Sequence, residues 1–484
     1  MDSTAFTMAA PRPGANVPAR PRKAWVETYG CQMNVSDGEL MQGVLASRGF
    51  ELADSPENAD IILVNTCAIR EHAEKRVLGR VSELNRIKQE RPDLVIGVTG
   101  CMAQRLGERL LERAPYVDLV MGPDGYRGLA EAVARIRPGW SRQTTPASAS
   151  IGRRGVLPVL DASRERLAVL ELAADENYEG LEVRRTSRIS AWVPIQRGCN
   201  HRCTFCIVPY VRGSEKNRDP ENILAEVRSV AGQGITEVVL LGQTVNSWWH
   251  GDWQFPALLR AVARVDGIRR VRFTSPHPND VTSELVAVMA NEPAVCRQLH
   301  LPVQAGHDRT LKRMLRRYTV ASYLDKVCLV RAAMPDIALS TDVIVAFPGE
   351  TEAEYEATLS LLRQVRFDDA FLYKYSVRDG TPATRLPANQ FLPADVAQKR
   401  LARTIEVQRA IQAEINAAEV GRAVEVLVER PARSQGDVLG RTAGNKVAAF
   451  PGTAELIGGY IEVRLTGTTG ATFRAERVQV PTPV

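Results

Sequence analysis

The sequence contains no run of about 18 uninterrupted apolar residues, the length that a transmembrane helix needs, so we expect no membrane span and no membrane partner. It also lacks a signal peptide, because the first 24 residues are rich in proline and contain no apolar core of about 7–15 residues. We therefore expect a cytoplasmic protein. In those reducing surroundings, clustered cysteines are more often ligands than disulfides.

Neither sign of charge dominates. The chain has 62 Lys and Arg residues against 56 Asp and Glu residues, and the net charge of +6 permits a polyanionic partner without requiring one. No solenoid repeat is visible. Hydrophobic residues make up 44% and charged residues 24% of the chain, a globular composition that excludes disorder for most of its length.

The length of 484 residues predicts about three domains, at roughly 100–200 residues each. Composition and periodicity divide the chain further into segments. We expect a flexible tail over residues 1–24, an α/β domain over 25–138, a linker or insertion over 139–188, a second α/β domain over 189–416 and a small all-β domain over 417–481.

Short apolar runs alternate with helical stretches in the first α/β domain. The runs are Ala24–Tyr29, Ile61–Asn65 and Leu94–Val98, and a helical pattern follows each of them. This rhythm predicts a parallel sheet flanked by helices. In the linker that follows, we expect some local helix near Ser163–Ala173.

A second series of strand and helix signals begins at Ile189. Six such units favour a partial (β/α)6 barrel over the complete eight-stranded form. From about Gly421 onward, short strands separated by Gly and Pro predict a small all-β barrel. The candidate barrel strands are Ala191–Gln196, Glu237–Leu241, Arg270–Thr274, Gln298–Val303, Ala338–Val345 and Ala370–Tyr375, with a helix over Arg309–Ala333 among those in the gaps.

Three cysteines lie within eight residues, directly after the first barrel strand, at Cys199, Cys203 and Cys206. A C-x3-C-x2-C loop can bind an iron–sulfur cubane through three thiolates, which leaves the fourth iron open for another ligand. The alternative is a structural zinc site that includes His201. Because only one residue separates Cys199 from His201, and no second C-x2-C completes the set, zinc is the less favoured reading.

Three further cysteines, Cys31, Cys67 and Cys101, each follow a strand of the first domain. The carboxyl ends of parallel strands share one edge of the sheet, so these thiols should converge and could hold a second cluster. The alternative is that they are small buried hydrophobic residues, as free cysteines often are. Cys296 and Cys328 lie in apolar contexts without ligand spacing, and we expect both in the core.

The Cys-x3-Cys-x-Phe-Cys loop resembles the signature of radical S-adenosylmethionine (SAM) enzymes. With the motifs Tyr-Gly-Cys-Gln-Met-Asn at Cys31 and Asn-Thr-Cys-Ala-Ile-Arg-Glu at Cys67, the chain from Trp25 to Val480 resembles the MiaB-type tRNA methylthiotransferases. The resemblance implies a methylthiotransferase domain, a radical SAM domain and a C-terminal TRAM domain. It also implies the conversion of N6-isopentenyladenosine, on the 3′ side of the anticodon, into its 2-methylthio derivative.

The resemblance implies two 4Fe-4S clusters and SAM as cofactors. Cys199, Cys203 and Cys206 would carry the catalytic cluster that cleaves SAM, and the cluster at Cys31, Cys67 and Cys101 would hold the incoming sulfur. The implied partners are the tRNA anticodon stem-loop, an electron donor such as a reductase, and a sulfur donor, the last two unidentified. The residues implied for SAM binding are Gly242, Gln243, Asn246, His300, Gln304, Asp342 and, after the cluster loop, Arg212.

Some of these assignments have simpler alternatives. His300 and Asp342 could equally be satisfied structural polar groups. The chain departs from the family at Ala346, where a glycine is usual, although the added methyl is small enough to retain adenine binding. Other candidates for RNA contact are Arg433, Arg441 and Lys446, which could touch phosphates, and Trp248, Trp249 and Trp253, for which local packing is the more expected role.

Three alternative functions remain. Two methylthiotransferase families share the chemistry but act on threonylcarbamoyl-adenosine in tRNA or on an aspartate of a ribosomal protein. The Tyr-Gly-Cys-Gln-Met-Asn motif and Gly440-Arg441-Thr442 favour the prenylated adenosine. The third is an RNA-binding protein with structural metal, which two separate cysteine triads argue against.

Overall fold

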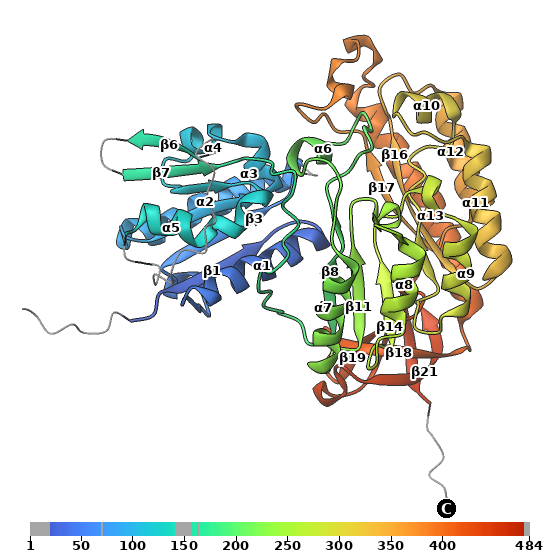
Figure 1. Cartoon of the computed structure of the whole chain (residues 1–484). Helices are drawn as coiled ribbons and strands as arrows, with labels where there is room; N and C mark the ends of the chain where they lie inside the picture. The colour runs from blue at the N-terminus through green and yellow to red at the C-terminus, as the bar shows by residue number, and fades with distance from the viewer. Residues whose placement is uncertain (1–19, 69–70, 139, 141–155, 162–163, 479–484) are drawn as a thin grey trace, which may run out of the picture.

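The computed structural model describes residues 20–68, 71–138, 140, 156–161 and 164–478 (Figure 1). The predicted tail up to residue 19 lies outside these residues, as do residues 139, 141–155 and 162–163 of the predicted linker. An α/β domain, blue to cyan in Figure 1, lies beside a half-open barrel coloured green to orange, and a small β-barrel, in red, closes one end of the larger barrel.

The first domain is built on a seven-stranded sheet in the order β2-β1-β3-β4-β5-β7-β6. All its strand pairs are parallel except β6 with β7. The three predicted strands are confirmed as β1, β3 and β4, of which β3 and β4 are buried along their whole length, as expected for inner parallel strands. The strands are β1 (Lys23–Thr28), β2 (Glu51–Leu52), β3 (Ile61–Thr66), β4 (Val95–Gly100), β5 (Leu119–Met121), β6 (Val156–Asp161) and β7 (Arg164–Val169).

Helices cover both faces of this sheet and bury separate apolar clusters. One cluster includes residues of α1 and α5, and the other includes residues of α2, α3 and α4. The helices are α1 (Gln32–Ser47), α2 (Glu71–Glu90), α3 (Cys101–Leu106), α4 (Arg109–Arg113) and α5 (Leu129–Ile136).

The helix expected near Ser163–Ala173 is wrong, because the structure forms strand β7 there. β7 pairs in parallel with β5 and antiparallel with β6, so this part of the predicted linker completes the first sheet. Leu167 and Ala168 are both buried within it. A short apolar run alone does not distinguish a helix from a strand. Here the segment forms a strand because it can pair with the open edge of β5.

Six parallel strands form the central barrel, and all six predicted strands are confirmed. They lie in two sheets, β14-β11-β8 and β15-β16-β17, which the parallel bridge between Val271 and Val295 connects. Within the described chain, β8 and β17 do not pair, so the barrel is open between them. The strands are β8 (Ser190–Pro194), β11 (Glu237–Leu241), β14 (Arg270–Phe273), β15 (Gln298–His300), β16 (Ala338–Val345) and β17 (Asp369–Lys374).

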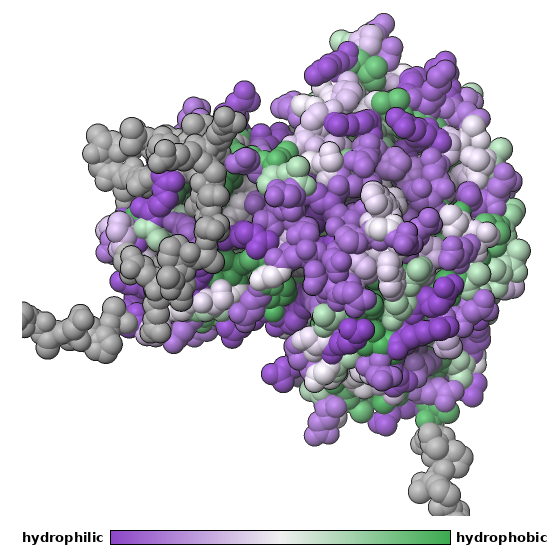
Figure 2. All heavy atoms as spheres, in the orientation of Figure 1, coloured by the Kyte–Doolittle hydropathy of each residue, from purple (hydrophilic) through white to green (hydrophobic). Residues whose placement is uncertain are grey.

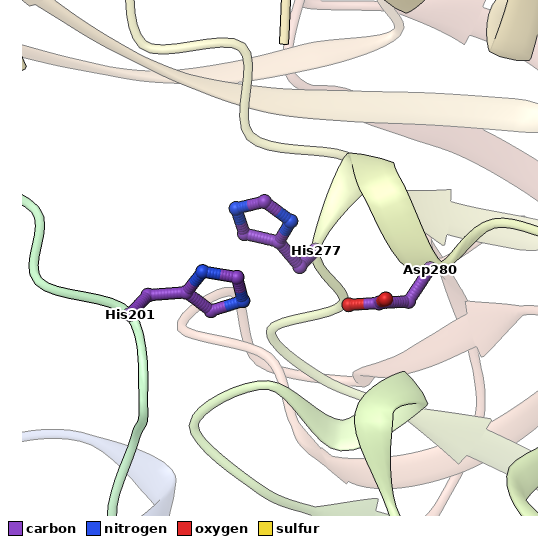
Figure 3. Close-up of side chains that lie close together, drawn as sticks. All are labelled: His201, His277 and Asp280. Carbon is purple, nitrogen blue, oxygen red and sulfur yellow. The ribbon is translucent and has the colours of Figure 1, made fainter. Parts of the chain in front are cut away.

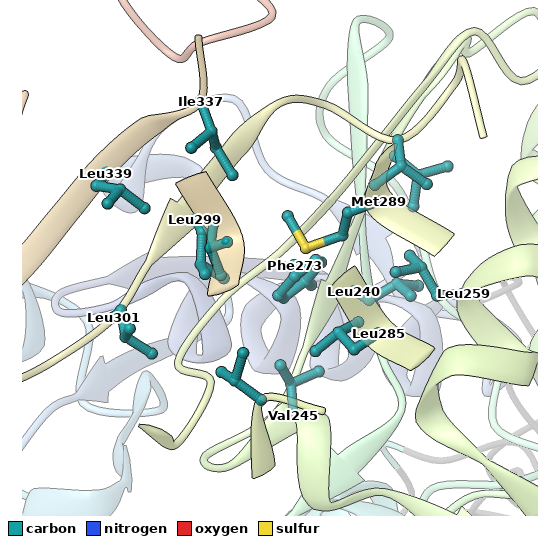
Figure 4. Packing of buried hydrophobic residues seen from close by; sticks show 14 of the residues in the cluster. Leu240, Val245, Leu259, Phe273, Leu285, Met289, Leu299, Leu301, Ile337 and Leu339 are labelled. Carbon is teal, nitrogen blue, oxygen red and sulfur yellow. The ribbon is translucent and has the colours of Figure 1, made fainter. Parts of the chain in front are cut away.

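Helices surround the barrel, and its core lies between them and the strands. Figure 4 shows Leu240 and Phe273 from the strands against Leu285 and Met289 from α9. Asp219 accepts backbone hydrogen bonds at the start of α7, and Thr351 forms a capping box at the start of α12. The helices are α7 (Pro220–Gly232), α8 (Phe255–Ala263), α9 (Ser283–Asn291), α10 (Asp308–Arg313), α11 (Val320–Ala333), α12 (Glu352–Val365) and α13 (Ala394–Glu419).

The single helix predicted over Arg309–Ala333 is also wrong, because the structure divides it into α10 and α11. Leu315 in the break has a φ of +54°, which ends the first helix. Thr319 then begins α11 as the first member of a capping box. The long helix α13 was not predicted, although its many Ala, Glu, Gln and Arg residues favour helix.

Cys296 and Cys328, the two cysteines expected in the core, differ in their exposure to solvent. Cys296 is buried, as predicted. Cys328 is exposed on α11, so that prediction is wrong. Neighbouring residues of a helix point in different directions, and the apolar neighbour Val327 faces the core instead.

The small C-terminal domain is a closed barrel of five strands in the order β18-β19-β20-β22-β21, which confirms the predicted small all-β barrel. It packs on the starts of the central strands. Arg270, the first residue of β14, donates to the carbonyls of Arg441 and Glu425, and Arg272 donates to that of Thr442. The strands are β18 (Ala423–Pro431), β19 (Asp437–Thr442), β20 (Val447–Pro451), β21 (Tyr460–Thr468) and β22 (Thr472–Arg477).

The face of the molecule in Figure 2 is mainly hydrophilic, with small hydrophobic areas scattered over it. Among the described helices, none combines the length and apolar character needed to cross a membrane.

Candidate active site

One cavity of about 300 Å³ is lined by all six predicted ligand cysteines. It lies between the carboxyl edge of the first sheet and the carboxyl ends of the barrel strands. We call Cys31, Cys67 and Cys101 the sheet triad, and Cys199, Cys203 and Cys206 the loop triad. The convergence of two separate triads on one cavity is the main geometric feature of this site, and metal binding by them stays a prediction.

Each cysteine of the sheet triad lies where a strand gives way to a helix. Cys31 is the N-cap of α1, Cys101 is the first residue of α3, and Cys67 directly follows β3. Gly30 has a φ of +134°, and a Cβ built there would lie 2.5 Å from the Cβ of Cys67. Glycine is therefore required beside the triad, both for the turn and for the close approach of Cys67.

The environment of the sheet triad favours a thiolate at one position and a thiol at another. A hydrogen bond from Cys67 and the charge of Arg212 lower the pKa of Cys31 to about 6, against the opposing effect of burial. Burial raises the pKa of Cys101. Cation binding would displace the remaining thiol protons, since metal ligands must be deprotonated.

Arg212 reaches from the barrel domain into the sheet triad. It directly follows α6 (Val208–Val211), and its Nε donates to the Sγ of Cys101 at 3.2 Å. Its Nη2 donates to Oδ2 of Asp37 at 2.6 Å, and both side chains are buried. The structure thus places Arg212 beside the sheet triad, whereas the resemblance implied SAM binding.

The loop triad is held by its own short loop and by a buried ion pair. Gly198 has a φ of +75°, and a Cβ there would lie 1.9 Å from the carbonyl oxygen of Ser214. Arg197, one residue earlier, is fully buried and pairs with Asp124 of the first domain at 2.6 Å. This pair ties the loop to the neighbouring domain. Burial raises the pKa of Cys199 to about 11 and that of Cys206 to about 12.

Arg316 lies beside the loop triad and was missed in the sequence. Its Nη1 donates to the Sγ of Cys203 at 3.3 Å, and its Nε donates to the hydroxyl of Tyr318 at 2.9 Å. Both residues belong to the break between α10 and α11. The capping box at Thr319 was the signal that could have located this break.

Six of the seven residues implied for SAM binding line the cavity, namely Arg212, Gly242, Gln243, His300, Gln304 and Asp342. His300 lies between two polar groups, with Nδ1 at 3.0 Å from Oγ of Ser340 and Nε2 at 3.4 Å from Oδ2 of Asp342. The Oε1 atoms of Gln243 and Gln304 are buried and have no hydrogen-bond partner among the described residues.

Asn246 does not line the cavity. Its side chain donates to the carbonyl of His277 at 2.9 Å and accepts from the backbone N–H of the same residue at 2.7 Å. The position of Asn246 therefore fits a structural role, which holds the segment around His277 at the cavity wall.

His201 packs against His277, and Figure 3 shows both rings near Asp280. The ring centroids are 3.9 Å apart and the planes differ by 11°. Parallel rings point their nitrogen lone pairs along separate planes, so they do not converge on one tetrahedral zinc. Burial lowers the pKa of His277 to about 2, and burial also lowers that of His201. The parallel rings argue against one zinc shared by His201 and His277, whereas the zinc alternative of His201 with the three loop cysteines stays untested.

The residues around the cavity fit the cofactors that the resemblance implies. Each triad offers three sulfur ligands, the usual donors for an iron–sulfur cluster. The two unpaired amide oxygens fit a ligand that donates hydrogen bonds, such as the amino group of SAM.

The candidate RNA contacts are mostly occupied by other partners. Arg441 pairs with Glu429 at 2.7 Å, and Lys446 pairs with Asp368 at 2.7 Å. Arg433 is exposed. Of the three tryptophans, Trp248 is buried and Trp253 packs on the barrel core, while Trp249 is 60% exposed and remains available for contact.

Three family profiles match the chain. They are "Uncharacterized protein family UPF0004" over residues 23–122, "Radical SAM superfamily" over 193–362 and "TRAM domain" over 417–478. Two solved structures are similar in fold at low identity. The radical SAM methyltransferase TsrM from Kitasatospora setae has a TM-score of 0.55 at 15% identity, covering 76% of this chain and 78% of that one. The cobalamin-dependent radical enzyme OxsB has a TM-score of 0.52 at 14% identity, covering 81% and 56%.

Curated relatives match nearly the whole chain. A protein of Chloroherpeton thalassium is 40% identical over 455 residues, which are 93% of this chain and 95% of the relative. A protein of Moorella thermoacetica is 42% identical over 457 residues, or 93% and 97%. Both are named tRNA-2-methylthio-N(6)-dimethylallyladenosine synthase.

Proposed function

The chain belongs to the tRNA-2-methylthio-N(6)-dimethylallyladenosine synthase family, and we propose that it converts N6-isopentenyladenosine in tRNA into 2-methylthio-N6-isopentenyladenosine. The modified nucleoside is the one next to the anticodon on its 3′ side. The chain is thus a radical SAM transferase of alkylthio groups, with two 4Fe-4S clusters and SAM as cofactors. The observation that carries the proposal is one cavity lined by two separate cysteine triads.

The reaction requires more than acid–base chemistry. The target carbon of adenine bears a non-acidic aromatic hydrogen, which a general base removes poorly. When bound, the cofactors supply one-electron cleavage of SAM at the loop triad and a site for the incoming sulfur at the sheet triad.

The residues of the chain bind and orient these groups. The loop triad binds one cluster, and the sheet triad binds the other. The unpaired amide oxygens of Gln243 and Gln304 would accept hydrogen bonds from SAM, and His300, which lies between Ser340 and Asp342, would form part of the polar wall of its site. The pair Arg197–Asp124 holds the two domains in register, so that both triads face the same substrate.

The finer assignments belong to the same proposal. We infer that the small barrel contributes to binding the anticodon stem-loop, that the enzyme works in the cytoplasm, and that a reductase and a sulfur donor serve it. The loop triad fits this function better than that of an RNA-binding protein with structural metal, because all three of its cysteines line a cavity.

Nucleoside mass spectrometry of tRNA from a deletion strain tests the function. We expect 2-methylthio-N6-isopentenyladenosine to disappear and N6-isopentenyladenosine to accumulate, and the restored gene to reverse both changes. A gene carrying Cys203→Ala is the matched control and should not restore the product. An unchanged nucleoside would move the substrate to threonylcarbamoyl-adenosine or the ribosomal-protein aspartate.

A further inference from the structure

Each cysteine triad has one arginine whose guanidinium donates a hydrogen bond to a cysteine sulfur. Arg212 contacts Cys101 at 3.2 Å, and Arg316 contacts Cys203 at 3.3 Å. Hydrogen bonds to the ligand sulfurs, together with local net charge, are among the factors that set the reduction potential of an iron–sulfur cluster. The two contacts are nearly equal in length, so any difference between them must come from the surrounding charges.

The charge of Arg212 is partly offset by a carboxylate. Its Nη2 lies 2.6 Å from Oδ2 of Asp37, and the two side chains are 2% and 0% exposed. In such a buried pair the negative charge offsets part of the field of the positive one, and little solvent is present to screen either of them. The sheet triad therefore receives a hydrogen bond and only a reduced positive field.

The charge of Arg316 is not neutralised by a carboxylate. Its partners are the sulfur of Cys203, the hydroxyl of Tyr318 and the carbonyl of Pro302, the last at 3.4 Å. Across the part of the chain that the structure describes, no Asp or Glu lies within ion-pair distance of it. The guanidinium is always charged and is half-buried, so its positive field acts on the loop triad with limited screening.

We propose that Arg316 raises the reduction potential of the cluster bound by the loop triad, and that Asp37 weakens the equivalent effect of Arg212 on the sheet triad. The inference rests on the proposed function, because it requires both clusters. The step concerned is the uptake of one electron from an external one-electron donor, with no bond formed or broken and no proton transferred. A positive charge favours the reduced cluster, which carries one more negative charge.

Potentiometric titration followed by electron paramagnetic resonance measures this effect without turnover. The full-length protein is reconstituted anaerobically and titrated in the absence of SAM, so that SAM binding cannot contribute. A triple Cys→Ala variant of the sheet triad isolates the loop cluster, and the same change in the loop triad isolates the other. Arg316→Gln is then introduced into the first background and Asp37→Asn into the second.

We expect Arg316→Gln to shift the reduction equilibrium of the loop cluster at least tenfold toward the oxidised form, which equals about 59 mV for a one-electron couple. Arg316→Lys keeps the charge and should restore at least half of that shift. Asp37→Asn should shift the sheet cluster in the opposite direction, toward the reduced form. Arg317→Gln removes the same charge from the adjacent exposed residue and should shift the equilibrium by less than about twofold, since solvent screens it.

Several outcomes would overturn the inference. One is an Arg316→Gln protein that retains about four irons per chain with an unchanged equilibrium. Another is an equal shift in Arg317→Gln, which would indicate a general charge effect. Loss of iron from both Arg316→Gln and Arg316→Lys would show a structural role instead. If the wild-type protein binds no cluster at all, the proposed function fails as well, whereas product formation without the predicted shifts rejects only this inference.

Discussion

The two triads line the same cavity but depend on different parts of the fold. The loop triad needs eight consecutive residues and one turn, so its geometry is largely local. The sheet triad exists only when β1, β3 and β4 are in parallel register and their carboxyl ends meet at one edge. A local arrangement should tolerate damage elsewhere in the chain, while a distributed one should fail whenever its sheet is disturbed.

Removal of a loop cysteine should have the largest effect. Cys203→Ala leaves two sulfur ligands in the loop, and we expect SAM cleavage to fall below detection. Formation of 5′-deoxyadenosine, measured by mass spectrometry under anaerobic conditions, checks this result. Cleavage at more than a few per cent of the wild-type rate would contradict the assignment of the loop triad.

Removal of a sheet cysteine should distinguish the role of the sheet triad from that of the loop triad. In Cys67→Ala we expect SAM cleavage within about threefold of wild type and no methylthiolated product. Iron should fall from about eight to about four per chain, since one cubane is lost. Normal product formation by this variant would contradict the role assigned to the sheet triad.

Two glycine substitutions test the distributed triad and the local triad without touching a ligand. In Gly30→Ala the new Cβ would lie 2.5 Å from that of Cys67, so product formation should fall at least tenfold while SAM cleavage persists. In Gly198→Ala the Cβ would lie 1.9 Å from the carbonyl oxygen of Ser214, so SAM cleavage itself should fall. Both activities are measured on the same preparations, and equal losses in both variants would remove the distinction between the triads.

A substitution away from both triads should have the smallest effect, which concerns the stability of the protein and neither triad. Ala346 has a φ of +58°, a left-handed conformation that costs an L-residue about 1 kcal/mol. We expect Ala346→Gly to raise the free energy of unfolding by about 0.5 kcal/mol, because the greater flexibility of unfolded glycine offsets part of the gain. Thermal unfolding checks the direction, and a lower melting temperature would show that the alanine methyl makes a needed contact.

The sequence was a good guide wherever a structural element depended on nearby residues or on strand order. The six barrel strands, and the meeting of Cys31, Cys67 and Cys101, followed from periodicity and from the shared edge of parallel strands. The contacts of Arg212 with Asp37 and Cys101 cross a domain boundary, and no local pattern encodes them. Site roles for the cysteines remain predictions until cluster binding is measured.

Two misjudged elements had different physical causes. β7 is decided by the available edge of β5, which lies far away in the sequence. The break before α11 has a local signal at Thr319, but the helix-favouring residues on either side of it suggested one continuous helix. Because Arg316 lies in that break, the same error concealed its contact with Cys203.

The small barrel packs on the starts of the central strands, at the end opposite the cavity. Its Gly444 lies beside Ala338, where β16 begins, and the eight residues of β16 cover about 25 Å at roughly 3.3 Å per residue. An RNA bound by the small barrel would have to extend over this distance for its target nucleoside to reach the cavity lined by the cysteines. Under the proposed function, the distance between the small barrel and the cavity would then select the target nucleoside along the stem-loop, in addition to its chemistry.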